Sequence, residues 1–194
     1  PETDDTDFTM TRFTEIVNKD LNGLLGNFVS RVCKLTDKNF GLNVPKSGST
    51  DSALAARLDE KIAELTSMLD ACEFRKSISA LREIYSIANE YMTAREPWAL
   101  VKNGDTTGAG VALNECFQLI DFFARVSAPI IPDSAEKMQN IFENKHDLSW
   151  PTKYEHRIQY GEKFVVPENL FNRIDDETLK TLEERFSKNK DKSE

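Results

Sequence analysis

Apolar side chains recur at helical spacing along most of this chain, and this period constrains the fold more than any other feature. The first such stretch covers residues 10–35, where apolar residues repeat at i, i+3 and i+4. Similar stretches cover residues 51–71, 74–96 and 111–126. Pro97 must end or kink the third stretch, because proline lacks the amide hydrogen that a helix interior needs. The pattern predicts an all-α fold, an antiparallel helix bundle.

Polar and turn-forming segments separate these stretches. Residues 39–50 are rich in Gly, Asn, Pro and Ser and have no apolar period, so we expect a loop. Residues 102–108 are expected to form a turn before the fourth helix, whose low charge predicts that it is the most buried. Asp133 is expected to cap a short fifth helix.

The last part of the chain has a different pattern. Residues 146–172 are aromatic-rich and without helical period, and a short amphipathic helix is expected at residues 175–186. We therefore expect two parts, a helical bundle at residues 1–145 and an extended returning tail with a final short helix at residues 146–194.

Composition excludes several classes of protein. The chain has 194 residues, enough for one well-buried domain, and no apolar run approaches the roughly 18 residues that a membrane span requires. Its three cysteines are widely spaced within apolar patterns, which predicts buried thiols in a reducing compartment. With only two histidines, neither near a cysteine, no zinc site is expected.

Two short signatures carry candidate chemistry. Asn27 and Arg31 are four residues apart on the first helix, which places an amide and a guanidinium on one face, one turn apart. Trp98 follows the helix break at Pro97 and offers a flat surface on which an unstacked base could lie. On residue type alone, a packing role for the pair and a core position for the tryptophan remain open and are favoured.

The net charge of −8 argues against binding to duplex phosphates. The objection is weaker for single-stranded loops, where stacking and base-edge hydrogen bonds supply much of the discrimination. Moreover, the segment that holds Arg31, Lys34, Lys38 and Lys46 is locally basic. We expect weak affinity for RNA from this chain alone.

Taken together, several blocks of this sequence resemble a known family. They are Asn-Lys-Asp-Leu at residues 18–21, Leu-Gly-Asn-Phe-Val-Ser-Arg at 25–31, Asn-Glu-Tyr at 89–91, Glu-Pro-Trp at 96–98 and Pro-Ile-Ile-Pro-Asp-Ser-Ala-Glu-Lys-Met at 129–138. In order and spacing they resemble the C-terminal anticodon-binding domain of methionyl-tRNA synthetase, a class I aminoacyl-tRNA synthetase, over nearly the whole chain. Their occurrence together favours RNA contact over packing for the signature residues.

The resemblance implies a specific site. Asn27, Arg31 and Trp98 would meet the anticodon CAU, with Trp98 stacking on its first base, while Asn89, Tyr91 and Pro97 would support them. The implied partners are methionine tRNA and the catalytic domain of the full-length chain, with no membrane. This fragment would need no cofactor, whereas the parent ligase would use ATP.

Catalytic signatures of the family, a His-x-Gly-His-like motif and a Lys-Met-Ser-Lys-Ser-like loop, do not occur in this sequence. We therefore expect no catalytic residues and no methionine activation by this chain, which begins at Pro1 and looks like an excised fragment. A cytoplasmic location is expected, with mitochondria as the alternative. Two other functions stay open, the equivalent domain of another class I synthetase and a helical protein-interaction module.

Overall fold

The computed structural model describes residues 7–190, with side chains up to residue 187, and in this range it confirms the all-α bundle. The helices are α1 (Met10–Ile16), η1 (Val17–Gly26), α2 (Asn27–Phe40), α3 (Ser52–Asp70), α4 (Phe74–Arg95), α5 (Pro97–Lys102), α6 (Thr106–Ser127), α7 (Pro132–Gln139) and α8 (Asp176–Lys190). Two isolated antiparallel bridges, Asn43 with Lys163 and Phe142 with Phe164, are the extended pairings of the described range.

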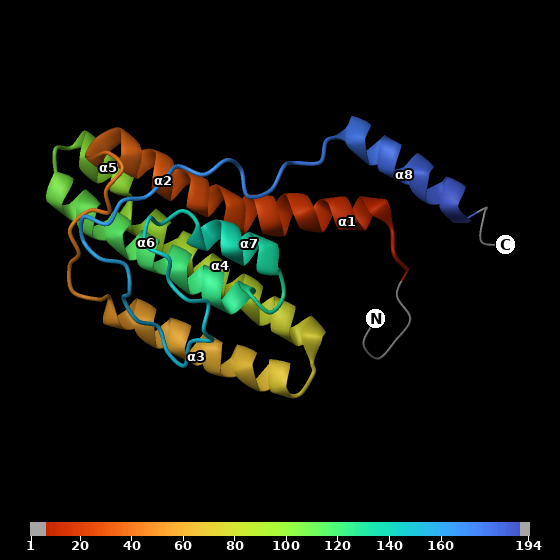
Figure 1. Cartoon of the computed structure of the whole chain (residues 1–194), viewed down its shortest axis with the longest axis horizontal. Helices are drawn as coiled ribbons and strands as arrows, with labels where there is room; N and C mark the ends of the chain where they lie inside the picture. Colours follow the sequence, from red (N-terminus) through yellow and green to blue (C-terminus); the bar gives the residue numbers. More distant parts are fainter. Residues whose placement is uncertain (1–6, 191–194) are drawn as a thin grey trace.

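The first long helix is continuous but not uniform. α1, η1 and α2 follow one another without a break along one edge of the bundle (Figure 1). Thr9 is the N-cap of α1, and its side-chain oxygen accepts a hydrogen bond from the Arg12 backbone amide at 3.2 Å. The helix extends to Phe40, five residues beyond its expected end, and Gly41 terminates it with a positive φ of 70°. The middle segment η1 is a π-helix, which the apolar period did not predict.

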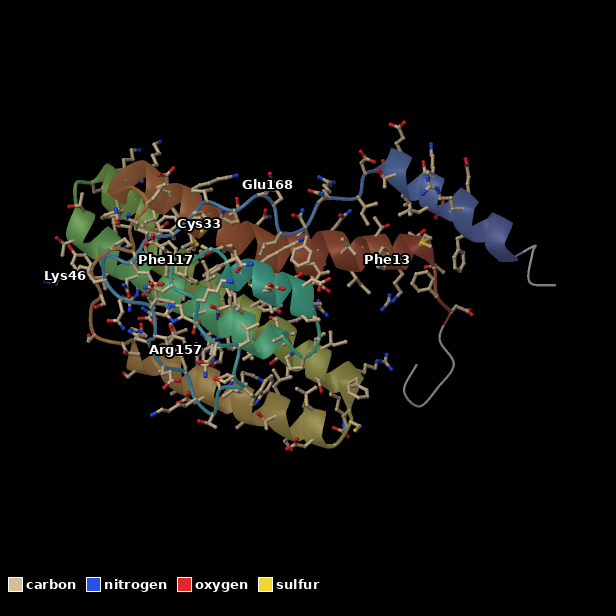
Figure 2. The ribbon with its side chains drawn as sticks, in the orientation of Figure 1. Phe13, Cys33, Lys46, Phe117, Arg157 and Glu168 are labelled. Carbon is tan, nitrogen blue, oxygen red and sulfur yellow. The ribbon has the colours of Figure 1, made fainter. Side chains whose placement is uncertain are left out.

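α6 lies at the centre of the bundle, as its low charge predicted. It is buried along almost its whole length, and α2 and α4 pack against it. It starts at Thr106, inside the expected turn, because the side chain of Asp105 caps it by accepting a hydrogen bond from the Gly108 amide at 2.8 Å. Phe117 of α6 points into the interior of the bundle (Figure 2) and is fully buried.

The break at Pro97 is as predicted, but a short helix follows it. α4 ends at Arg95, Glu96 adopts a left-handed conformation with φ 42° and ψ 54°, and Pro97 opens α5. Proline is well suited to the first helical position, where its missing amide hydrogen is not needed. The six residues of α5 were not expected from the sequence, because so short a helix has no apolar period to detect.

The prediction that Asp133 caps the fifth helix is wrong. Ile131 is the N-cap of α7, and Pro132 occupies the first helical position, so Asp133 lies one residue inside the helix. There its carboxylate is still placed favourably, because the N-terminal turn of a helix carries a partial positive charge.

The cysteine prediction is correct for two residues and wrong for one. Cys33 and Cys116 are buried free thiols, and burial raises the pKa of Cys33 to about 12. Cys72 is exposed and has a positive φ of 56° in the turn between α3 and α4. Its position just beyond the end of α3 removes it from the apolar stripe that the sequence pattern assigned to it.

The extended tail after α7 is bound to α6 by buried polar groups. The Gln118 carbonyl oxygen accepts hydrogen bonds from the amides of Arg157 and Ile158 at 2.8 and 2.9 Å, and its amide nitrogen donates to the Ile158 carbonyl at 2.8 Å. Beyond the tail, α8 lies outside the bundle (Figure 1) and contacts α1, where Thr11 donates to Glu183 at 3.1 Å.

Two further observations concern the whole described range, residues 7–190. None of its helices combines the length and apolar character needed to cross a membrane. Its His, Cys, Asp and Glu side chains form no group of three or more that could hold a metal ion.

Candidate nucleic-acid interface

Asn27 and Arg31 lie on the solvent side of α2. Phe28, Val29 and Val32, which alternate with them along the helix, are fully buried and hold α2 in the core. Asn27 and Arg31 are both exposed, and the side-chain amide of Asn27 has no hydrogen-bond partner within the described part of the chain. The helix thus presents a side-chain amide and a guanidinium, one turn apart, to solvent.

Trp98 comes from α5 and meets the same face. It is half-buried and packs against the hydrophobic core, while the Arg31 guanidinium carbon lies 5.1 Å from the centre of its ring. This separation is within the range of a cation–π interaction. The structure therefore joins two of the three predicted site residues in direct contact, and it places the third on the same helix face as Arg31.

The break between α4 and α5 sets the direction of Trp98. The left-handed Glu96 turns the chain and the buried Pro97 fixes the start of α5 against the bundle. Without this turn, a continuous α4 would carry Trp98 along its own axis. Pro97 thus contributes to the direction in which α5 carries Trp98.

Asn89 and Tyr91, the other expected supporting residues, make different contacts. The side-chain amide nitrogen of Asn89 donates to the backbone carbonyls of Leu24 at 3.1 Å and Tyr85 at 2.8 Å. This side chain therefore links α4 to η1. Tyr91 is half-buried, and the Arg95 guanidinium carbon lies 5.4 Å from its ring centre. Burial raises the pKa of Tyr91 well above its usual range.

The exposed face of α2 is basic beyond the two signature residues. Lys34 and Lys38 are exposed, and the spacing 27, 31, 34, 38 places them on the Asn27 face. Within the described part of the chain, neither lysine nor Arg31 forms an ion pair, although the net charge of the whole chain is −8. Lys46, also exposed, lies in the loop after α2 at the α5 end of the bundle (Figure 2). We identified a basic segment from the sequence but did not place its residues on one helix face. The four-three-four spacing of positions 27, 31, 34 and 38 shows that they share a face.

Comparison with known proteins identifies the family to which this bundle belongs. A family model described as the anticodon binding domain of methionyl tRNA ligase matches residues 43–191. The chain belongs to this family. Trp98 falls within the matched range, and Asn27 and Arg31 precede it.

Individual relatives extend the match to nearly the whole chain. A methionine–tRNA ligase of Streptomyces avermitilis is 37% identical over 194 residues, covering 96% of this chain and 34% of the relative. One from Jannaschia sp. is 39% identical over 192 residues, covering 96% of this chain and 33% of the relative. The chain thus spans about a third of the length of these curated relatives.

A solved structure has the same fold. The apo form of Mycobacterium tuberculosis methionyl-tRNA synthetase superposes with a TM-score of 0.75 at 22% identity, over 87% of this chain and 35% of that chain. The family model therefore assigns the chain to the anticodon-binding domain of methionyl-tRNA synthetase, and the named relatives agree with this assignment. Neither alternative, another class I synthetase or a protein-interaction module, is favoured.

Proposed function

We propose that this anticodon-binding domain recognises the CAU anticodon of methionine tRNA through Asn27, Arg31 and Trp98. The observation that carries the proposal is the Arg31 guanidinium lying 5.1 Å from the centre of the Trp98 ring, on the helix face that exposes Asn27. This arrangement combines an aromatic surface for stacking with hydrogen-bonding groups for a base edge.

The chemistry of the pair fits cytosine at the first anticodon position. Cytosine offers an amino group as donor and a carbonyl oxygen and ring nitrogen as acceptors. The Asn27 side-chain oxygen suits the amino group, and the Arg31 guanidinium suits the acceptors. Uracil has a carbonyl in place of the amino group and a donor at the ring nitrogen, so protein groups would be left unpaired. Each unpaired buried group costs about 1–3 kcal/mol, or about 5- to 150-fold in affinity.

Arg31 must move for this recognition to occur. Its guanidinium lies over the Trp98 ring, where it occupies space that a stacking base would need. In the proposed complex the guanidinium turns from the indole to the base edge, and the base takes its place on the ring. The contact in the free chain then keeps both side chains ordered and close to their binding positions.

The rest of the proposal concerns the longer protein. Docking of the correct anticodon would hold the tRNA so that its acceptor end reaches a catalytic domain elsewhere in the ligase. ATP would be used there, and this domain would need no cofactor and perform no catalysis of its own. The cytoplasm is the inferred compartment, with mitochondria as the alternative.

Discrimination between two stem-loops tests the proposal. We expect the folded chain, at a stated low salt concentration, to bind a CAU stem-loop about 5- to 150-fold more tightly than a UAU stem-loop. Arg31→Lys keeps the charge but loses the planar donor fork, so the preference should fall close to one. Arg57→Lys, on the exposed side of α3 and paired with Glu90, is the matched control and should keep it. Equal binding of both loops by the folded wild-type chain would contradict the proposal.

Lys34 and Lys38 are expected to contribute affinity without specificity. Replacing either lysine by alanine should weaken binding to both loops equally, because phosphate contacts carry no base information. The slope of log affinity against log salt concentration should become shallower by about 0.7 per lysine removed, the value for single strands. Lys180→Ala, an exposed position on α8, is the control and should leave the slope unchanged. An unchanged slope in the α2 variants would remove this face from the interface.

A further inference from the structure

The π-helix η1 leads directly into the candidate site. Its last turn is closed by the backbone amide of Asn27, which donates to the backbone carbonyl of Asn22 five residues earlier. Extended π-helices are rare, since α-helical hydrogen bonding is normally preferred, and π segments are frequently found at functional sites. Contacts with other parts of the chain must therefore stabilise η1. The structure shows such contacts on two sides of it.

The C-terminal tail holds the first side. The amide nitrogen of Asn18 donates to the Ile174 carbonyl at 2.8 Å, and its oxygen accepts from the Ile174 amide at 2.8 Å. One side chain thus satisfies both backbone groups of a residue 156 positions away. Phe171 of the same tail segment lies against Gly26, where a β-carbon would be 3.5 Å from its ring. We call the contacts of Asn18 with Ile174 and of Gly26 with Phe171 the tail clamp; the tail passes η1 just before α8 (Figure 1).

Helix α4 holds the second side. Asn89 donates to the Leu24 carbonyl in η1, and Arg82 forms an ion pair with the buried Asp20 at 2.9 Å. Within the described part of the chain, none of these groups forms a hydrogen bond with the Asn27 side chain. They contact η1, the helical segment that leads into Asn27.

We infer that Asn18 is a positioning residue. Through the tail clamp it holds η1 in its π register and so directs the side-chain amide of Asn27 toward the base edge. The inference rests on the proposed function. A change to α-helical hydrogen bonding would move the bond of the Asn27 backbone amide from the carbonyl of Asn22 to that of the next residue. It would also rotate the junction between η1 and α2. Arg31 lies one turn further into α2, where Phe28 and Val32 anchor the helix in the core, so it depends much less on the clamp.

A double-mutant cycle tests the positioning role. Asn18→Ala and Asn27→Ala should each reduce the preference for a CAU over a UAU stem-loop at least fivefold, and the double variant should lose no more than Asn27→Ala alone. Asn172→Ala, an exposed asparagine of the same tail segment, is the matched control and should keep the wild-type preference. A merely structural role would lower the folded fraction and weaken binding to both loops equally, leaving their ratio unchanged, and that result would overturn the inference.

Hydrogen exchange tests the clamp without RNA. In Asn18→Ala the amides of residues 22–27 should exchange at least tenfold faster than in the wild type, whereas Asn172→Ala should not differ from it. Unchanged exchange in Asn18→Ala overturns the clamp whatever the RNA results are. A wild-type chain with no CAU preference overturns the proposed function and the positioning role together, while faster exchange would still establish that the tail holds η1.

Discussion

Replacing Trp98 by alanine is expected to weaken binding of the CAU stem-loop by about 5- to 150-fold. Stacking of one base on an aromatic side chain contributes about 1–3 kcal/mol, and alanine offers no surface for it. The variant also removes the ring over which Arg31 lies, so the guanidinium loses its ordered position and specificity should fall together with affinity. Fluorescence anisotropy with labelled CAU and UAU stem-loops measures both quantities.

Two variants make this result interpretable. Trp98→Phe keeps an aromatic face and should retain more affinity than Trp98→Ala. Trp150→Ala removes the other tryptophan, which packs against the core from the tail and donates to Thr66 at 3.0 Å. It should lower stability without changing the loop preference of the folded protein. If Trp98→Ala binds both loops like the wild type, Trp98 is a packing residue and the site assignment is wrong.

Replacing Phe123 by alanine is expected to destabilise the domain by about 3–5 kcal/mol. Phe123 is fully buried on α6 and contacts Phe28 of α2 and Tyr85 of α4, with ring centres 5.3 and 5.0 Å apart. Its removal opens a cavity where three helices meet, and the surrounding side chains can fill it only in part. Since small domains are stable by only about 5–15 kcal/mol, the variant should be close to unfolding under mild conditions.

Urea denaturation followed by circular dichroism measures this loss. Phe74→Ala is the matched control, because the Phe74 side chain at the start of α4 is 56% exposed. Its replacement should change the free energy of unfolding by no more than about 0.5 kcal/mol. A loss below 1 kcal/mol for Phe123→Ala would show that the three helices do not share one close-packed centre.

The helix positions were largely predictable from local sequence. Asp51 caps α3 by accepting hydrogen bonds from the Ala53 and Leu54 amides, and Pro97 ends α4, each through chemistry confined to a few neighbouring residues. The burial of α6 followed from its low charge. Asp133 and Cys72 were misplaced because the pattern that located them leaves the exact end of a helix undetermined by one or two residues.

The candidate site was predictable only in part. The four-residue spacing of Asn27 and Arg31 places them on one face of any helix, so their shared orientation is a property of the sequence. That Trp98 reaches this face was supplied by resemblance to a family, since nothing in the local sequence relates α5 to α2. Lys34 and Lys38 could have been added to the face from their spacing alone.

The sequence by itself determined the all-α class, the order of the main helices and most of the residues that face the core, because these depend on apolar period, caps and helix breaks. Only the tertiary structure decided the π register of η1, the contact between Arg31 and Trp98, and the hydrogen bonds between Asn18 and Ile174. Each of these joins groups far apart in the chain or replaces a locally preferred hydrogen bond. Their energies therefore arise only once the bundle has packed.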